Sequence, residues 1–501
     1  MYLRSRASNM AKMQPTDQAN GPAEAAASLS FAAGARAGTP LFRQIYARVR
    51  DAILAGELRE GARLPSVRLL AAQLPASRTT VQAAYDLLAA EGLVTGRGAA
   101  GTVVGPVSPA SRLPTPERPA PAGVIPGIEL GAAPRPFQMG LPAIDQFPRK
   151  VWCRLAAQAA RGLTDASIVY QDPGGDPALR QAIVAYLAVA RGVTCTAAQV
   201  IVTSGFLGAL ALVAAALLRP GDKVWVEDPG YFIARQLLEL AGLVPVPVPV
   251  DAEGIDVDAG IARAPDARLV VVTPTHQFPL GMTLSLRRRL ALVEWARSSG
   301  ARIVEDDYDS EYRYLGRPPQ ALGGLDEHGR VLHVGTFSKV LFPSLRLGYL
   351  VAPPAEAERL LRARFLLGGH ASALDQAILC LLMRSGGFSR HIGRMRRLYA
   401  ARRTALASAL ERHAGDLGRV EMAAGGMHLL LRLPDGSDDV AMAAAAWKHG
   451  LAARALSSLA LQAGAGRALL LGFASLPEAS ADAAASRLRA ALTEAPASPI
   501  A

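Results

Sequence analysis

The residues best suited to chemistry lie in the stretch GTFSKVLFPSLRLGYL, residues 335–350. Lys339 is its only lysine, and small or apolar residues surround it, which is a poor setting for a solvated amine. A lysine amine in a partly dry pocket has a lowered pKa and can condense with an aldehyde cofactor. Ser338 and Arg346 are close in sequence, and hydroxyl and guanidinium groups commonly bind phosphate. The stretch therefore predicts a lysine that holds a phosphorylated aldehyde.

Three other segments carry groups that such a cofactor needs, and each follows a β-rich run. VTSGFLGALALV predicts a strand, a turn at Gly205 and a helix from Phe206, whose free N–H groups could bind phosphate. VEDDYDSEY places Asp306 where it could pair with a pyridine nitrogen, with Tyr308 within reach of a ring hydroxyl. EDPGYF offers Tyr231 as a stacking ring. Because ligands of α/β sheets bind at the carboxyl ends of strands, these segments together predict one site.

Each of these features alone has a simpler explanation. A lone lysine among apolar residues is more often salt-bridged than catalytic, and the acids from Glu305 to Asp309 could form a cation site. His276 is too isolated a partner to favour a transition metal. The cysteines at 153, 195 and 380 have no paired spacing, so neither a disulfide framework nor a zinc site is expected. We therefore predict no metal, and the joint occurrence of the segments favours the cofactor site.

The surrounding pattern predicts several domains. Helices alternate with β-rich runs over residues 137–495, which is typical of an α/β domain with a mostly parallel sheet, and its last part predicts a smaller α+β subdomain. Residues 1–38 contain few large apolar residues and predict a disordered tail. Prolines recur through residues 107–136, which predicts a semi-rigid linker. Residues 39–106 remain as a separate small domain.

The small domain has the pattern of three helices followed by a β-wing, a winged helix-turn-helix. Ser66 and Ser77 are placed to begin the second and third helices. Between residues 41 and 104, eight arginines outnumber five acidic residues, which suits a DNA-binding surface. The alternative is a three-helix module that binds protein. The apolar stripe of the third helix comprises Val81, Ala84, Tyr85 and Leu88.

ILAGELREGARLPSVRLLAAQLPASRTTVQAAYDLLAAEGLV resembles the DNA-binding domain of GntR-type bacterial regulators. The family pattern contains L-P-S-x-R, S-R-x-T-V and L-x-x-E-G-L, and this chain matches all three. The wing GRGAAGTVV is one residue longer than the commonest form. The resemblance implies that operator contacts come from Arg68, Arg78, Thr79 and Thr80, with Gly101 at the wing tip.

The larger part resembles fold-type I aminotransferases, and the chain from residue 40 onward resembles the MocR/GabR family of GntR-type regulators. The matching motifs are YQDPGGDPALRQAIVAYLAVARGV, EDPGY, TPTHQFPLG, EDDYDSEYRY and TFSKVLFPSLRLGYL. The resemblance implies pyridoxal 5'-phosphate on Lys339 and a head-to-tail, domain-swapped homodimer. It assigns Asp306 to the pyridine nitrogen, Tyr308 to the ring hydroxyl, Tyr231 to stacking, and Gly205, Phe206, Ser338 and Arg346 to the phosphate, with Tyr170 reaching the phosphate of the neighbouring subunit.

Two departures from the aminotransferase pattern bear on function. The usual N-P-x-G reads Phe278-Pro279-Leu280-Gly281 here, so the asparagine that approaches the ring hydroxyl is absent and His276 or Gln277 is left to replace it. The usual R-L-G-F reads LLGF, so Leu470 stands where an arginine would clamp an amino acid carboxylate. Arg467 is the nearest arginine that could substitute. The loss predicts poor transamination of ordinary α-amino acids.

The sequence thus predicts a pyridoxal phosphate-dependent regulator that binds double-stranded operator DNA and a small-molecule effector. The effector would be pyridoxal phosphate itself, or an amine, amino acid-like compound or sulfonate, with at most a partial transamination reaction. The alternatives are a working aminotransferase with a DNA-binding appendage, and a structural interaction protein with an empty site. The net charge of +12 permits DNA binding. Without a long apolar run or a secretory signal, we expect a cytoplasmic protein and no membrane contact.

Overall fold

The computed structural model describes residues 39–74, 76–98, 101–106, 133–462 and 464–494. The chain forms two compact units, Met1–Ala132 and Ala133–Ala501. The predicted tail, residues 1–38, and most of the predicted linker, residues 107–136, lie outside the described residues. Each unit has a hydrophobic core of its own.

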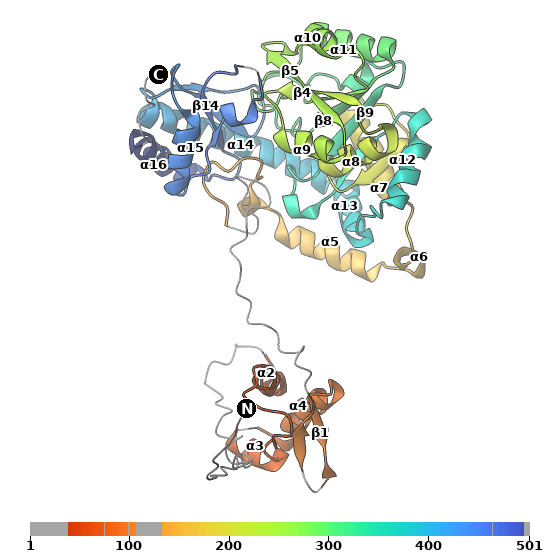
Figure 1. The fold of residues 1–501 in the computed structure, drawn as a ribbon, viewed down its shortest axis with the longest axis vertical. Coiled ribbons are helices and arrows are strands. Elements are labelled where there is room, and N and C mark those ends of the chain that lie inside the picture. Colours follow the sequence, from red (N-terminus) through yellow and green to blue (C-terminus); the bar gives the residue numbers. More distant parts are fainter. Residues whose placement is uncertain (1–38, 75, 99–100, 107–132, 463, 495–501) are drawn as a thin grey trace, which may run out of the picture. The chain divides into compact units, whose positions relative to one another are not determined.

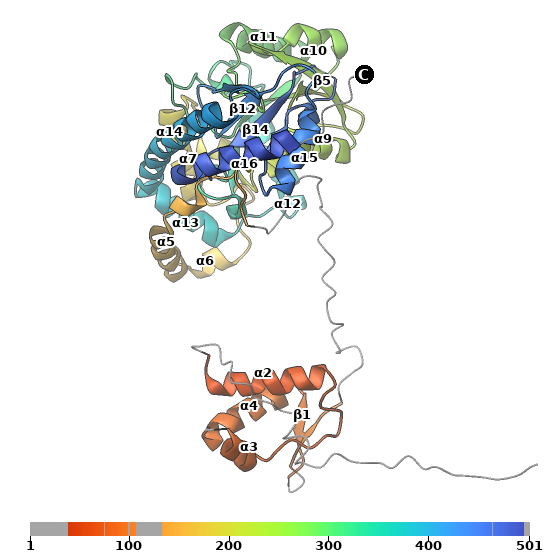
Figure 2. The same cartoon turned by 90° about the vertical axis from the view of Figure 1, so that its left-hand side faces the viewer.

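The first unit is a winged helix-turn-helix, as predicted (Figure 2). The Ser66 and Ser77 hydroxyls accept hydrogen bonds from the backbone N–H groups of Leu69 and Thr80, which fixes where the second and third helices begin. The predicted stripe of the third helix is buried, and it packs against Ile45, Val49 and Ile53 of the first. The elements are α2 (Leu41–Leu54), α3 (Val67–Gln73), α4 (Arg78–Ala90), β1 (Val94–Gly96) and β2 (Thr102–Val104).

The second unit is built on a mixed sheet with eight strands among the described residues, in the order β3-β10-β9-β8-β7-β4-β5-β6. Strands β4, β5, β7, β8 and β9 run parallel, whereas β10 is antiparallel to both of its neighbours. The sequence VPVPVPVD, which the sequence analysis did not assign, forms β5. The bounds are β3 (Val200–Thr203), β4 (Lys223–Asp228), β5 (Val244–Asp251), β6 (Gly254–Ile255), β7 (Leu269–Val272), β8 (Arg302–Asp307), β9 (Val331–Thr336) and β10 (Gly348–Val351).

Helices cover both faces of this sheet (Figure 1). Alternate residues of β7 show this directly, because Leu269 and Val271 pack under α8 (Phe206–Leu217) and α9 (Phe232–Leu240), whereas Val270 and Val272 join the opposite core. α12 (Pro354–Leu366) completes the first layer. The opposite layer contains α5 (Arg149–Arg161), α7 (Pro177–Ala190), α10 (Val257–Arg263), α11 (Leu286–Ser299) and α13 (Ala373–Arg384).

The C-terminal portion forms the predicted smaller α+β subdomain. Its antiparallel sheet has the order β11-β12-β14-β13, and residues just after the linker join it through a bridge from Phe137 to Gly472. None of the helices in the described part of the chain is long and apolar enough to cross a membrane. The elements are α14 (Gly387–Ala414), β11 (Arg419–Glu421), β12 (His428–Arg432), α15 (Asp439–Lys448), β13 (Arg454–Ala455), β14 (Ala468–Gly472) and α16 (Ala481–Glu494).

The topology brings the predicted site residues to one edge. Strands β3, β4, β7, β8 and β9 all point the same way, because β10 is antiparallel to both β3 and β9. Their carboxyl ends therefore meet along one edge of the sheet, where ligands of α/β folds bind. The segments that follow these ends begin at Ser204, Pro229, Thr273, Tyr308 and Phe337.

Candidate functional site

Lys339 lies just beyond the end of β9 and faces the segment that follows the linker. Its Nζ donates a hydrogen bond to the Gly140 carbonyl at 2.9 Å. Gly140 has a φ of +72°, and a Cβ there would lie 2.5 Å from the same Nζ, so this position requires glycine. Burial lowers the pKa of Lys339, and the carboxylates of Asp306 and Asp309 oppose that shift. Burial thus favours the neutral form of the amine, whereas the two carboxylates favour its charged form.

Asp306 provides the second half of the site. Its side chain is buried near the end of β8, and Oδ1 has no hydrogen-bond partner among the described residues. Burial raises its pKa well above the ordinary value, and repulsion from Asp307 and Asp309 adds to the shift, while Lys339 opposes it. An orphaned buried oxygen is unfavourable unless something donates to it. The pocket therefore has a place for a ligand N–H group at this atom.

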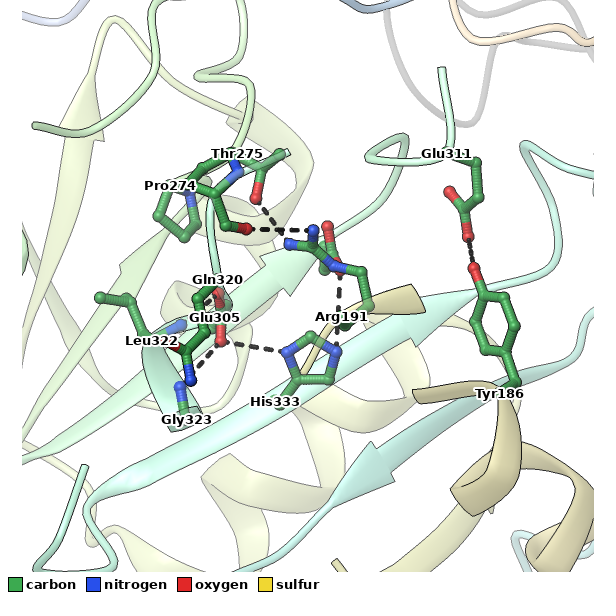
Figure 3. A network of polar contacts seen from close by, with 12 residues as sticks. Tyr186, Arg191, Pro274, Thr275, Glu305, Glu311, Gln320, Leu322, Gly323 and His333 are labelled. Carbon is green, nitrogen blue, oxygen red and sulfur yellow. Dashed lines mark hydrogen bonds and ion pairs between the residues drawn. The ribbon is translucent and has the colours of Figure 1, made fainter. Parts of the chain in front are cut away.

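The neighbours of Asp306 on β8 face the opposite side of the sheet, and each pairs with a basic side chain there. Asp307 pairs with Arg191, with 2.5 Å between Oδ2 and Nε, and Glu305 lies 3.0 Å from His333 Nδ1. Figure 3 shows Arg191 and Glu305 on either side of the His333 ring. Burial alone would raise the pKa of Glu305, but His333 holds it below its usual value. This network fixes the strand and leaves Asp306 as the acid of β8 that faces the pocket.

Hydroxyl and N–H groups converge at the start of α8. Gly205 has a φ of +87° and precedes the helix without a side-chain cap, so the first helical N–H groups are open. A Cβ on Gly205 would lie 3.8 Å from Thr336 Oγ1 and 4.0 Å from Ser338 Oγ. Both hydroxyls therefore face the helix N-terminus, which is a favourable arrangement for an anion. Phe206 contributes its N–H here, while its side chain lines the adjoining pocket.

Tyr231 lies on the other side of this pocket. Burial raises its pKa to about 12, with Asp306 adding to the shift and the positive charges of Arg346 and Arg454 opposing it. Both arginines are thus close enough to act on the phenol electrostatically. Arg346 is exposed and has a left-handed backbone with φ of +50°. The Tyr231 ring packs edge-on against Phe278, with centroids 5.9 Å apart.

His276, and not Gln277, contacts Tyr308, the residue predicted to lie beside the ring hydroxyl. Tyr308 donates its hydroxyl to the His276 carbonyl at 3.0 Å, and the same oxygen lies 2.9 Å from His276 Nδ1. Asp309 Oδ2 lies 3.0 Å from that nitrogen. The Gln277 amide instead donates to the Pro229 and Phe278 carbonyls. His276 Nε2 is buried and has no partner among the described residues.

Leu470 and Arg467 occupy different environments. Leu470 is fully buried in an apolar cluster with Leu430, Leu456 and Leu459. Arg467 pairs with Asp439 at 3.5 Å and is 47% exposed, so it does not replace the missing arginine.

Sequence reasoning missed two residues that the fold brings to the site, Gly140 and Arg454. Nothing in their local sequence marks them, because each arrives from a different part of the fold.

Tyr170 does not join the other residues. It follows the short helix α6 (Asp165–Ile168) and is 94% exposed. A side chain so open to solvent packs against none of the site residues of its own described chain. Its predicted role across a dimer, and the dimer itself, remain predictions.

The predicted DNA-reading residues lie on the first unit. Arg68 and Arg78 are exposed and have no acidic partner among the described residues, in contrast to Arg48 and Arg50, which pair with Glu57 and Asp51. The hydroxyls of Thr79 and Thr80 each lie 2.7 Å from the Ser77 hydroxyl at the start of α4.

A further arginine, Arg63, lies beside the wing. Gly101 has a φ of +84°, and a Cβ there would lie 3.0 Å from Arg63 Nε. Sequence reasoning counted Arg63 but did not assign it to the wing, where its backbone bridges Val103.

No group of three or more His, Cys, Asp or Glu residues in the described ranges is arranged to hold a metal ion.

Comparisons with known proteins agree with this architecture. Residues 144–488 match the family of class I and II aminotransferases, and residues 41–104 match the gntR family of bacterial regulatory proteins. The chain is 38% identical to the probable rhizopine catabolism regulatory protein MocR of Rhizobium meliloti, over 88% of this chain and 91% of that protein. It is 33% identical to the HTH-type pyridoxine biosynthesis transcriptional regulator PdxR of Corynebacterium glutamicum, over 88% and 93%.

Solved structures show the same fold for the second unit. A kynurenine aminotransferase of Pyrococcus horikoshii superposes with a TM-score of 0.65 at 28% identity, over 72% of this chain and 90% of that chain. A multiple substrate aminotransferase from Thermococcus profundus gives the same TM-score and identity, over 72% and 91%.

Proposed function

We propose that this chain is a transcriptional regulator that binds operator DNA and pyridoxal 5'-phosphate. The proposal starts from the fact that the chain belongs to the class I and II aminotransferase family and carries a GntR-family domain. One observation carries the cofactor part. The amine of the half-buried Lys339 and a buried Asp306 oxygen without a partner lie within electrostatic reach of each other at one sheet edge. Among the described residues, no protein group donates a hydrogen bond to that oxygen.

The residues present fit this cofactor. Lys339 would supply the amine, Asp306 Oδ1 would accept from the pyridine nitrogen, and the Tyr231 ring would stack on the ring face. The phosphate end corresponds to the open N–H groups after Gly205, with the Ser338 hydroxyl and the Arg346 guanidinium. When bound, the cofactor supplies an aldehyde that condenses with amines and a ring that accepts electrons.

Other groups around the pocket would position the cofactor ring and the lysine amine. Tyr308 and His276 form a hydrogen-bonded pair on which the ring hydroxyl would rest, and Asp309 orients the imidazole. Burial disfavours the charged amine of Lys339 and so favours its neutral, nucleophilic form. The Gly140 carbonyl holds that amine in place.

The first unit supports the DNA part of the proposal. Arg68 and Arg78 are exposed and unpaired within the described chain, so they can neutralise phosphates without first giving up an internal ion pair. We include an effector and a homodimer in the proposal, with Tyr170 reaching the partner's site. Regulation in this sense requires that the effector bind one arrangement of the protein more tightly than another.

A working aminotransferase is the second candidate, because the second unit has the fold of the kynurenine and multiple substrate aminotransferases. Leu470 argues against turnover of α-amino acids, since a buried leucine cannot bind a carboxylate.

Selection of bound sequences from a random DNA pool tests the proposal. The purified protein should enrich a defined operator, the Arg78→Ala variant should not, and pyridoxal phosphate should change the affinity of the wild type but not of Lys339→Ala. The wild type should develop a visible absorbance band with the cofactor, and Lys339→Ala should lack it. An operator affinity that ignores the cofactor in both proteins would contradict the sensing role, and rapid turnover of many amino acids would favour the enzyme.

A further inference from the structure

Arg454 lies directly across the sheet from Leu470. β13 and β14 pair antiparallel in a register that sets Arg454 opposite Leu470. Opposed residues of an antiparallel pair point to the same face, with Cβ atoms about 4.5–5.5 Å apart. The face of Leu470 packs toward Phe232 and Phe278, which adjoin Tyr231. The Arg454 side chain therefore leaves the sheet on the side of the candidate cofactor pocket.

The Arg454 guanidinium has an aromatic contact but no counter-ion. Its carbon lies 4.2 Å from the centroid of the Phe232 ring, and the residue is half-buried. Within the described ranges, no carboxylate pairs with this side chain and no hydrogen-bond acceptor receives its N–H groups. Burial lowers its pKa, and Tyr231 opposes the shift. A half-buried cation of this kind is an unfilled position for an anion.

Three other arginines near Arg454 each have an acidic partner. Arg432 on β12 contacts Glu421 at 3.1 Å, Arg467 contacts Asp439 at 3.5 Å, and Arg235 on α9 contacts Glu239 at 3.8 Å. Each of these arginines has an acidic residue within ion-pair distance, although all three belong to the same subdomain or line the same pocket.

The loop after β13 is hydrogen-bonded to the segment that ends β4. The backbone N–H groups of Leu461 and Gln462 donate to the Asp228 carboxylate at 2.7 and 2.8 Å. Gly230 donates to the Leu459 carbonyl at 3.4 Å. Phe232 and Leu459 both line the pocket that contains Tyr231 and Asp306. Through its contact with Phe232, Arg454 thus adjoins the residues that line that pocket.

We infer that Arg454 is the anion-binding residue of the effector site and that the effector is a primary amine carrying an oxyanion, either a carboxylate or a sulfonate. This inference rests on the proposed function, because the amine end is assigned to the Lys339 side of the pocket. The apolar cluster around Leu470 cannot solvate an acid, so the anion is displaced by one strand toward β13. Arg454, on the neighbouring strand β13, thus binds the anion in place of the arginine that is missing at position 470.

The test uses the full-length protein loaded with pyridoxal phosphate, in the wild type, Arg454→Gln, Arg454→Lys and the matched control Arg467→Gln. The probes are alanine, β-alanine, taurine and the neutral amine ethylamine, and the readouts are the visible absorbance band and the thermal midpoint. At least one acidic amine should act on the wild type at far lower concentration than ethylamine. Arg454→Gln should weaken that response by at least about tenfold, which is typical of a lost charge-assisted hydrogen bond.

Arg454→Lys should retain part of the response, and Arg467→Gln should retain all of it. A comparison of β-alanine with taurine separates carboxylate from sulfonate, since their spacers are equal in length. An unchanged response in Arg454→Gln, an equal response to ethylamine, or no response to any acidic amine overturns the inference while the cofactor band persists. A wild type that never develops the band overturns the proposed function as well, which separates the two failures.

Discussion

Replacing Asp306 with asparagine should have opposite effects on stability and on cofactor binding. The carboxyl is buried, one oxygen has no partner among the described residues, and its pKa is raised by burial and by Asp307 and Asp309. Asparagine keeps nearly the same shape and removes the titrating group. The cofactor-free protein should therefore become more stable, while the cofactor should bind more weakly.

The sign of the pH effect follows from proton uptake. The folded protein keeps Asp306 protonated at pH values where the unfolded chain, with an aspartate pKa of about 3.9, has ionised it. Folding thus takes up a proton, and the free energy of unfolding of the wild type falls as pH rises through that window. The Asp306→Asn variant is free of this decline, so its advantage should grow with pH. Because one proton is taken up on folding, the advantage should grow by up to about 1.4 kcal/mol for each pH unit within that window.

Cofactor binding should change in the other direction. A hydrogen bond between a carboxylate and a charged ring nitrogen contributes about 1.5–3 kcal/mol, which corresponds to roughly 10- to 150-fold in the dissociation constant. Urea unfolding of the cofactor-free proteins between pH 5 and about 8 and titration of the visible band would measure both effects. Asp416→Asn, an exposed carboxylate beside Arg489, is the control and should alter neither. A destabilised Asp306→Asn protein, or one with unchanged cofactor affinity, would refute the reasoning.

Three further changes test other parts of the chain. Arg78→Ala should reduce the slope of log affinity against log salt by about 0.9 for each DNA phosphate that is no longer neutralised, whereas Arg48→Ala, whose guanidinium is paired, should leave the slope nearly unchanged. Gly140→Ala should slow formation of the visible band and destabilise the protein by about 1 kcal/mol or more, because the residue has φ of +72° and its new Cβ would meet Lys339 Nζ. An unaltered rate of band formation would contradict this expectation. Leu88→Ala should cost about 2–5 kcal/mol in the first unit, so that DNA binding is lost on warming while the cofactor band remains, and simultaneous loss of both signals would argue against separate folding of the two units.

The sequence was sufficient for features whose causes are local. Ser77 begins a helix because its hydroxyl accepts from the N–H three residues later, and the motif contains both partners. Asp306 and Lys339 could be placed at a common edge because parallel strands align their carboxyl ends, and the β-rich runs before them are distinct. Fold class and the candidate pocket followed from such short-range patterns.

Features that depend on pairing between distant segments could not be predicted. Arg454 reaches the pocket only through its register with Leu470, and a two-residue strand gives no periodic signal. Gly140 meets Lys339 because the segment after the linker packs across the site, 199 residues away in sequence. Strand β5 was missed because proline alternates with valine, although it lies beside the short edge strand β6, where a missing N–H donor is tolerated.

The alternation along β8 makes this strand intolerant of length changes. Asp306 faces one side, while Glu305 and Asp307 face the partners that neutralise them. Since side chains alternate with a period of two, a slip of one residue would turn Asp306 toward Arg191 and leave its two neighbours facing the pocket, away from Arg191 and His333. A single-residue insertion in β8 would thus exchange the roles of three acids at once, although the composition of the strand would hardly change. In β8, the order of the three acidic residues along the strand therefore matters more than how many of them there are.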